Sequence, residues 1–145
     1  MAEYTAVAKQ TIPPGESVIF TATTIACPCG NVRHSDGTPS FVLKGYNKPT
    51  CGCTGRGTTD YNVSFGANVA LSSGAEVAPI NVSITVGGTI LPSTTMMSSP
   101  AAVEQFNAVS KTTAVPIWNG CCQTIAVTNN GTTSIDMQNA VIVIK

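Results

Sequence analysis

Hydrophobic and polar residues alternate with a period of two along much of this chain, which is the pattern of half-buried β-strands. The stretch YNVSFGANVAL, residues 61–71, is apolar at every odd position. The stretch INVSITV, residues 80–86, is apolar at its even positions and runs into Gly87-Gly88, which can turn the chain. The apolar positions are Tyr61, Val63, Phe65, Ala67, Val69 and Leu71, then Ile80, Val82, Ile84 and Val86. Both stretches predict strands with one buried face.

Shorter segments continue the same pattern between turn residues. Asp36-Gly37 is a hairpin signal, and it predicts two short strands within residues 31–45 joined by Ser35–Thr38. Further strands are predicted around Val18–Thr23, within 104–118, at Gln123–Thr128 and at the end of the chain. SPAAVEQF, residues 99–106, is the one helix candidate, because Ser99 could cap it and Pro100 suits the first helical position.

The terminal segment Ala140–Ile144 is apolar at every position, whereas a surface strand would alternate. We therefore expect both of its faces to be buried, the second one by neighbouring subunits. Each fully buried Val or Ile contributes about 1.5–3 kcal/mol, so several per chain would make a trimer obligate. The predicted oligomer contacts are Val141, Ile142, Val143 and Ile144.

Eight or more short strands punctuated by Gly and Pro predict an all-β fold, a β-sandwich of the jelly-roll type. The length of 145 residues suits one domain. We expect a single jelly-roll domain over residues 1–145, with a cysteine-rich hairpin or loop insertion at about 26–55.

Charge is scarce and balanced in this chain. Seven basic and seven acidic side chains give zero net charge, and only 10% of residues are charged, against about 25% in an ordinary globular domain. This predicts that partner subunits cover much of the surface. Without a basic patch we expect no nucleic-acid partner, and without a long apolar run no membrane insertion. No signal-peptide pattern is visible at the first residues, so we expect synthesis in the cytoplasm.

The six cysteines form two Cys-x-Cys pairs around the predicted hairpin and one adjacent pair: Cys27, Cys29, Cys51, Cys53, Cys121 and Cys122. Residues two apart share a face of a strand, so the first four thiols could converge at the hairpin base. Disulfides are our first expectation, Cys27 with Cys53 and Cys29 with Cys51 or the parallel alternative. Zinc held by those four thiolates comes second, since zinc knuckles use the wider Cys-x-x-Cys. Free thiols come third, and no other cofactor is expected.

Catalytic chemistry has little support in the sequence. The only histidine, His34, follows Arg33 and lies two residues before Asp36, so a Cys/His nucleophile pair is possible in principle. No nucleophile elbow, phosphate loop or His-rich metal motif is present in the sequence. A hairpin histidine is more often solvated or a subunit contact. We therefore expect neither an enzyme nor catalytic residues.

Three residues are candidates for ligand binding: Tyr46, Arg56 and Trp118. Trp118, beside Asn119-Gly120, could stack against a sugar ring. The lone tryptophan of a β-sandwich more often belongs to the core, however, which makes burial of Trp118 the first expectation.

Several segments resemble, in order, those of the jelly-roll domains of tumour necrosis factor and complement C1q in their bacterial and phage versions. They are GESVIF, YNVSFGANV, ITVGGTILPSTTM and AVIVIK. The sequence also resembles uncharacterised short cysteine-rich proteins of gut Firmicutes and their phages, which share the Cys-x-Cys, Arg-His and Gly-Cys-Cys elements. The cysteines depart from the general family. The resemblance implies a homotrimer with a structural or binding role, and it does not imply catalysis.

These inferences favour a structural virion protein of a phage. It would be a trimeric capsid decoration or head-fibre module on the particle exterior, in contact with capsid or other virion proteins. One alternative is a module that binds glycans or a host surface through loops at one end of the trimer. Another is a self-assembling bacterial surface or spore-layer protein, located at the cell surface and cross-linked by cysteines.

Overall fold

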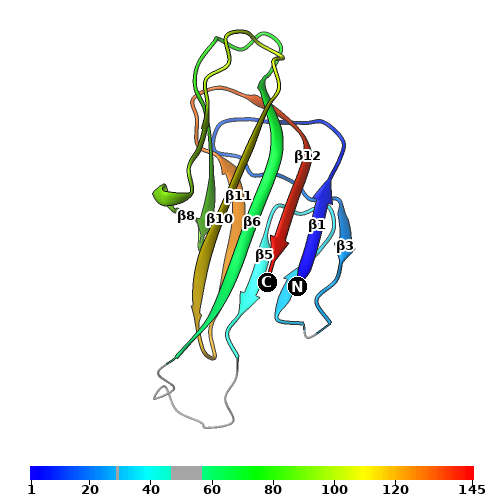
Figure 1. Cartoon of the computed structure of the whole chain (residues 1–145), viewed down its shortest axis with the longest axis vertical. Coiled ribbons are helices and arrows are strands. Elements are labelled where there is room, and N and C mark those ends of the chain that lie inside the picture. The colour runs from blue at the N-terminus through cyan, green and yellow to red at the C-terminus, as the bar shows by residue number, and fades with distance from the viewer. Residues whose placement is uncertain (29, 47–56) are drawn as a thin grey trace.

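The structure of this chain is a computed structural model that describes residues 1–28, 30–46 and 57–145. The described residues form two antiparallel sheets packed face to face (Figure 1). The front sheet has the order β10 (Asn107–Trp118), β6 (Thr58–Leu71), β12 (Ile135–Ile144), β1 (Ala2–Ala6) and β3 (Ala22–Ile25), with β2 (Gln10–Ile12) also paired to β12. The back sheet has the order β4 (Val32–His34), β5 (Phe41–Lys44), β11 (Cys122–Asn129), β7 (Ile80–Val86) and β8 (Thr89–Ile90), with β9 (Met96–Ser98) also paired to β7.

The expected all-β jelly-roll sandwich is confirmed, and its core lies between the two sheets. The odd-numbered side chains of β6 from Tyr61 to Leu71 are buried, as the alternation predicted. Ile80, Val82 and Ile84 of β7 are buried from the other side. Apolar burial of this kind is the main term that holds a sandwich together.

The Asp36-Gly37 hairpin is also confirmed. β4 and β5 pair antiparallel with Val32 opposite Leu43. The turn between them closes with a hydrogen bond from the Thr38 amide to the Ser35 carbonyl, 3.1 Å long. Gly37 adopts a φ of 84°, which explains why a glycine stands at this place in the turn.

The strand expected around Val18–Thr23 is misplaced, because it begins only at Ala22. Val18 and Phe20 are buried, and the Phe20 ring packs on Phe41 of β5. The backbone here makes isolated bonds rather than a strand, such as that from the Val18 amide to the Val127 carbonyl. The chain then crosses to the front sheet, where β3 pairs with β1. A crossing segment buries apolar residues as a strand does, which is why the alternation misled.

The helix expected within residues 99–106 is wrong, and the described residues contain only a short 3-10 turn, η1 (Pro92–Thr94). Glu104 explains the difference: its φ is 59°, and its amide donates to the Leu71 carbonyl at the end of β6. Tertiary pairing therefore replaces the helical bond. No helix in the described ranges is long and apolar enough to cross a membrane.

Strands β6 and β10 continue beyond the neighbouring strands of the front sheet. The pairing of β12 with β6 ends at Ile144 opposite Val63, but β10 pairs with β6 as far as Trp118 opposite Thr58. Figure 1 shows this two-stranded extension projecting past both chain termini. We call residues 58–60 and 116–118 the ribbon tip.

Candidate functional site

The ribbon tip presents an exposed tryptophan beside polar side chains. Trp118 lies opposite Thr58, and Pro116 lies opposite Asp60, two pairs further along the ribbon. Side chains two apart share a face, so these four lie on the outer face of the front sheet, and all four are exposed. The Thr58 hydroxyl donates to Asp60 Oδ1 over 3.0 Å. An indole, a hydroxyl and a carboxylate are therefore gathered on one small surface.

The expectation that Trp118 belongs to the core is wrong, since 64% of it is exposed. The reason is the alternation of β10. Val115 and Ile117 take the inward positions and are buried, so the next residue, Trp118, faces outward.

Hydrogen bonds fix the backbone around the ribbon tip. The Asn119 amide donates to the Gly57 carbonyl over 3.0 Å, and its side-chain Oδ1 accepts from Thr59 Oγ1 over 3.0 Å. The same Thr59 oxygen accepts from the Tyr46 amide over 2.9 Å, which places the 59% exposed Tyr46 beside the ribbon. The third candidate, Arg56, lies outside the described residues.

Gly45 allows β5 to come this close to the ribbon. A Cβ atom at this position would lie 2.2 Å from the carbonyl oxygen of Trp118, much closer than atoms can approach. The Gly45 amide donates to the Cys121 carbonyl over 2.9 Å. A glycine stands at position 45 because the backbone after β5 lies against the backbone of Trp118.

The cysteines are only partly described. Cys121 and Cys122 are exposed in the turn after β10 and at the first position of β11. Cys27 is half-buried in the loop between β3 and β4. Cys29, Cys51 and Cys53 lie outside the described residues, so the disulfide cluster and the zinc alternative both stay predictions. Among the residues that are described, no three His, Cys, Asp or Glu side chains converge as a metal site would require.

His34 lies beside a hollow of about 570 Å³ at the side of the sandwich where β3 faces β4. Its ring stacks on Phe41 with 4.3 Å between centroids and an angle of 20° between planes. Nδ1 is 3.0 Å from the Ser40 carbonyl, and Nε2 is 3.3 Å from the Phe20 carbonyl. The expectation was a solvated side chain or a subunit contact. His34 is instead half-buried in its own chain, because its position opposite Phe41 turns the ring inward, and the subunit contact stays a prediction. Both ring nitrogens face the backbone, which favours a structural role.

Tyr4 lies against the same histidine, with 4.9 Å between ring centroids. Burial raises the pKa of the Tyr4 phenol, and the nearby acidic groups of Cys27 and Asp36 raise it further. Tyr4 therefore stays neutral at physiological pH and can donate a hydrogen bond into the hollow that it lines.

The outer face of the front sheet has no charged side chain at its centre, on β6, β10 and the middle of β12, whereas Glu3 and Lys145 lie beside it. One row joins Val141, Gly66 and Ser110 across three strands, and the next joins Val143, Ser64 and Thr112. The positions that we call the uncharged face are Thr5, Asn62, Ser64, Gly66, Asn68, Ala108, Ser110, Thr112, Ala114, Val141 and Val143. Most of these side chains are small, and all are partly or fully exposed.

The structure divides the four predicted oligomer contacts. Ile142 and Ile144 point into the core of their own chain and are fully buried there. Val141 and Val143 lie on the uncharged face and are half-buried. Of the four predicted contacts, Val141 and Val143 are therefore the two that can meet a neighbour.

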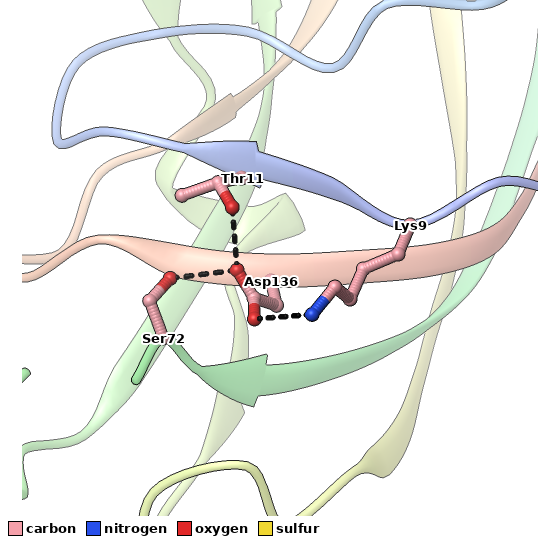
Figure 2. Close-up of polar contacts among 4 residues, drawn as sticks. All are labelled: Lys9, Thr11, Ser72 and Asp136. Carbon is pink, nitrogen blue, oxygen red and sulfur yellow. Dashed lines mark hydrogen bonds and ion pairs between the residues drawn. The ribbon is translucent and has the colours of Figure 1, made fainter. Parts of the chain in front are cut away.

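A buried carboxylate that sequence reasoning missed lies at the other end of β6 from the ribbon tip. Asp136 is 4% exposed, and its Oδ1 accepts from Thr11 Oγ1 over 2.7 Å and from Ser72 Oγ over 2.8 Å (Figure 2). Lys9 Nζ lies 3.5 Å from Oδ2. The sequence feature that could have indicated this buried carboxylate is the place of Asp136 between two apolar residues, Ile135 and Met137.

The contacts of Asp136 decide its charge. Burial by itself would raise the pKa of this carboxyl group, but the two hydroxyl donors and the Lys9 charge outweigh it and lower the pKa below its usual value. The carboxylate is therefore ionised at neutral pH. It joins β2, β6 and β12, which is a structural role.

Comparisons with known proteins agree on the fold. No protein-family model and no curated protein matches the sequence. The globular domain of zebrafish complement 1qA protein is 9% identical, with 99% of this chain and 94% of that chain covered and a TM-score of 0.64. The Eiger TNF of S. frugiperda is 10% identical, with 99% and 90% covered and a TM-score of 0.65.

Identities this low show the fold and nothing finer. A carbohydrate-binding module, CBM35 from Cellvibrio japonicus Abf62, also matches at 10% identity over 99% of this chain and 96% of that one, but its TM-score of 0.40 is too low to support an argument. The chain has the jelly-roll fold of C1q and tumour-necrosis-factor domains.

Proposed function

We propose that this chain is a homotrimeric structural module on the exterior of a phage virion, as a capsid decoration or a head-fibre module. The general role, structural or binding, is supported by the fold, which is a β-sandwich like those of C1q and tumour-necrosis-factor domains. The observation that carries the trimer is the uncharged face. The place on a virion is supported by the frequent use of jelly rolls in viral shells, which is an analogy of fold.

The uncharged face has the composition of an interface. Interface cores are depleted in charged residues, whereas the exposed surface of a soluble domain is rich in them. Glu3, Asp60 and Lys145 lie at the margins of this face, and small side chains fill its middle. Small side chains allow close approach of a second backbone. A standard interface buries about 800 Å² of each partner, so the proposed contact would extend over several strands of this sheet.

Val141 and Val143 supply the apolar centre of the proposed contact. They are half-buried in the single chain, so cover by a neighbour would remove their remaining apolar surface from water. Threefold symmetry follows from the resemblance to C1q and tumour-necrosis-factor domains. Two copies of the face would also associate, so oligomer mass is part of the test.

Proteomics of purified phage particles tests the location. We expect the chain in intact virions, in a copy number divisible by three. Its absence from particles, with the chain instead in the cell envelope, would favour the self-assembling bacterial surface or spore-layer protein. Turnover of a thiol, ester or glycoside substrate that is lost in His34→Ala would contradict the non-catalytic role.

A second candidate function is a surface-binding module, and the exposed Trp118 and Tyr46 at the ribbon tip favour it. The two functions are compatible, because a virion module can also carry a binding surface. A trimer that binds no surface ligand would leave only the structural role.

A further inference from the structure

We infer that the ribbon tip binds a neutral saccharide, with Trp118 as the stacking platform and Asp60 and Thr58 as the polar groups that hold the sugar hydroxyls. This deepens the second candidate function and rests on it. The site combines the two features that small-molecule sites share, an apolar surface and a few placed polar groups.

Trp118 supplies the apolar surface. An indole is large and flat, and it pairs an apolar face with a polar N–H. With 64% of the residue exposed, that surface can receive the C–H face of a sugar ring. The backbone beneath it is fixed, because its carbonyl accepts from the Cys121 amide over 2.9 Å.

Asp60 supplies the acceptors. In the described part of the chain its one hydrogen-bond partner is Thr58, which donates to Oδ1. Asp60 is exposed, so Oδ2 can accept from sugar hydroxyls, and hydrogen bonds to a charged acceptor are stronger than neutral ones. Thr58 has donated its own proton, so its oxygen can accept as well. The carboxylate would repel an acidic sugar, which is why the ligand is assigned as neutral.

The site stays accessible in the proposed trimer. The pair Trp118–Thr58 lies four residues along the ribbon from Ala114–Asn62, the nearest pair of the uncharged face, and Asp60 lies between them. At about 3.4 Å per residue this separates Trp118 from that face by about 14 Å. The ribbon also projects past β12 and β1, the other two strands that carry the uncharged face (Figure 1).

Fluorescence gives a direct test, since Trp118 is the only tryptophan in the chain. The probes are short neutral oligosaccharides of glucose, galactose, rhamnose and N-acetylglucosamine, first on an array and then titrated in solution. We expect saturable binding to at least one of them, with a change in Trp118 emission. We expect Trp118→Ala to weaken array binding at least about tenfold and Asp60→Asn about three- to tenfold.

Two control variants are matched to these changes. Met97→Ala removes another exposed apolar side chain, on β9, and Glu76→Gln neutralises another exposed carboxylate. Both should bind as the unmodified protein does.

Three results would overturn the inference. The first is no binding to any of these saccharides, and the second is binding that is unchanged in Trp118→Ala. The third is a free protein whose Trp118 emission is that of a buried indole and whose oligomer is lost in Trp118→Ala. The last result would assign the tip to contact between copies. The first two results leave the trimer proposal standing, because oligomer mass and virion proteomics do not depend on saccharide binding.

Discussion

The two ends of β6 treat polar and apolar side chains in opposite ways. At the end near Leu71, Asp136 and Asn129 are buried, and other residues satisfy their polar atoms. At the ribbon tip Trp118 is exposed, and so is the neighbouring Tyr46, although both carry large apolar rings. Burial of a polar group is costly unless it is hydrogen-bonded, so the first end is built for stability.

The exposed aromatics at the ribbon tip add little to the stability of the single chain. Exposure of a large aromatic surface is instead the mark of a place where something else binds. The comparison therefore separates a closed end that holds the fold from an open end that is available for recognition. The following predictions test that separation.

Asn129→Ala should produce the largest loss of stability. Nδ2 of Asn129 donates to the Ile12 and Thr133 carbonyls over 3.0 and 2.9 Å, and Oδ1 accepts from the Gly131 amide over 3.0 Å. Removal of this side chain leaves three backbone groups without partners, at a cost of about 3 kcal/mol in the free energy of unfolding. Urea unfolding measures it, with Gln123→Ala, an exposed amide side chain of the back sheet, as control, expected within about 0.5 kcal/mol. Equal costs for the two variants would break the comparison.

Asp136→Asn should cost about 1–3 kcal/mol at neutral pH, because the buried carboxylate loses its charge-assisted hydrogen bonds and its ion pair with Lys9. The folded-state pKa of Asp136 is lowered, so its contribution is complete above the unfolded-state pKa of about 4 and is lost as the pH falls through the folded-state value. The stability difference between the two proteins should therefore shrink in acid. A difference that grows in acid would contradict the lowered pKa.

Gly45→Ala should cost about 1–2 kcal/mol, since the new methyl group would meet the Trp118 carbonyl and force β5 away from the ribbon. We expect hydrogen exchange to rise at the Tyr46 and Asn119 amides, which are bonded there. Gly88→Ala is a poor control because its φ is positive, so Ala101→Gly in an exposed loop outside the uncharged face serves instead. Unchanged exchange at the tip would show that the close approach does not fix it.

Trp118→Ala should have the smallest effect on the fold, within about 0.5 kcal/mol in the unfolding free energy of the single chain. The same change should remove saccharide binding, so stability and recognition separate at one residue. A stability loss of several kcal/mol would instead place Trp118 in a contact that the single chain does not show.

The sequence predicted the β-sandwich because alternation along residues 61–71 and 80–86 follows directly from burial of one face. The Asp36-Gly37 hairpin was predictable for a similar reason, since the turn chemistry is local. The strand expected at Val18–Thr23 failed because a segment that crosses between sheets buries alternate residues too. The helix at 99–106 failed because Glu104 bonds to Leu71, a partner far away in sequence.

The candidate site was only partly predictable. The sequence analysis named Trp118 and Tyr46 as candidates. The position of Tyr46 beside β10 depends on Gly45, which allows the close approach, and on Thr59, which hydrogen-bonds to Tyr46 and to Asn119. Asp60 was missed, because its position beside Trp118 arises from the pairing register of two strands far apart in sequence. Register of this kind cannot be obtained from one strand's pattern.

Sedimentation equilibrium at micromolar concentration tests the central claim, assembly through the uncharged face, most directly. We predict a mass three times the 14.9 kDa of one chain, reduced to that of a monomer by Ser110→Glu, which places a charge in the proposed contact. The matched variant Ser73→Glu, in an exposed turn outside that face, should stay trimeric. A monomeric unmodified protein, or a Ser110→Glu variant that remains a trimer, would contradict the account.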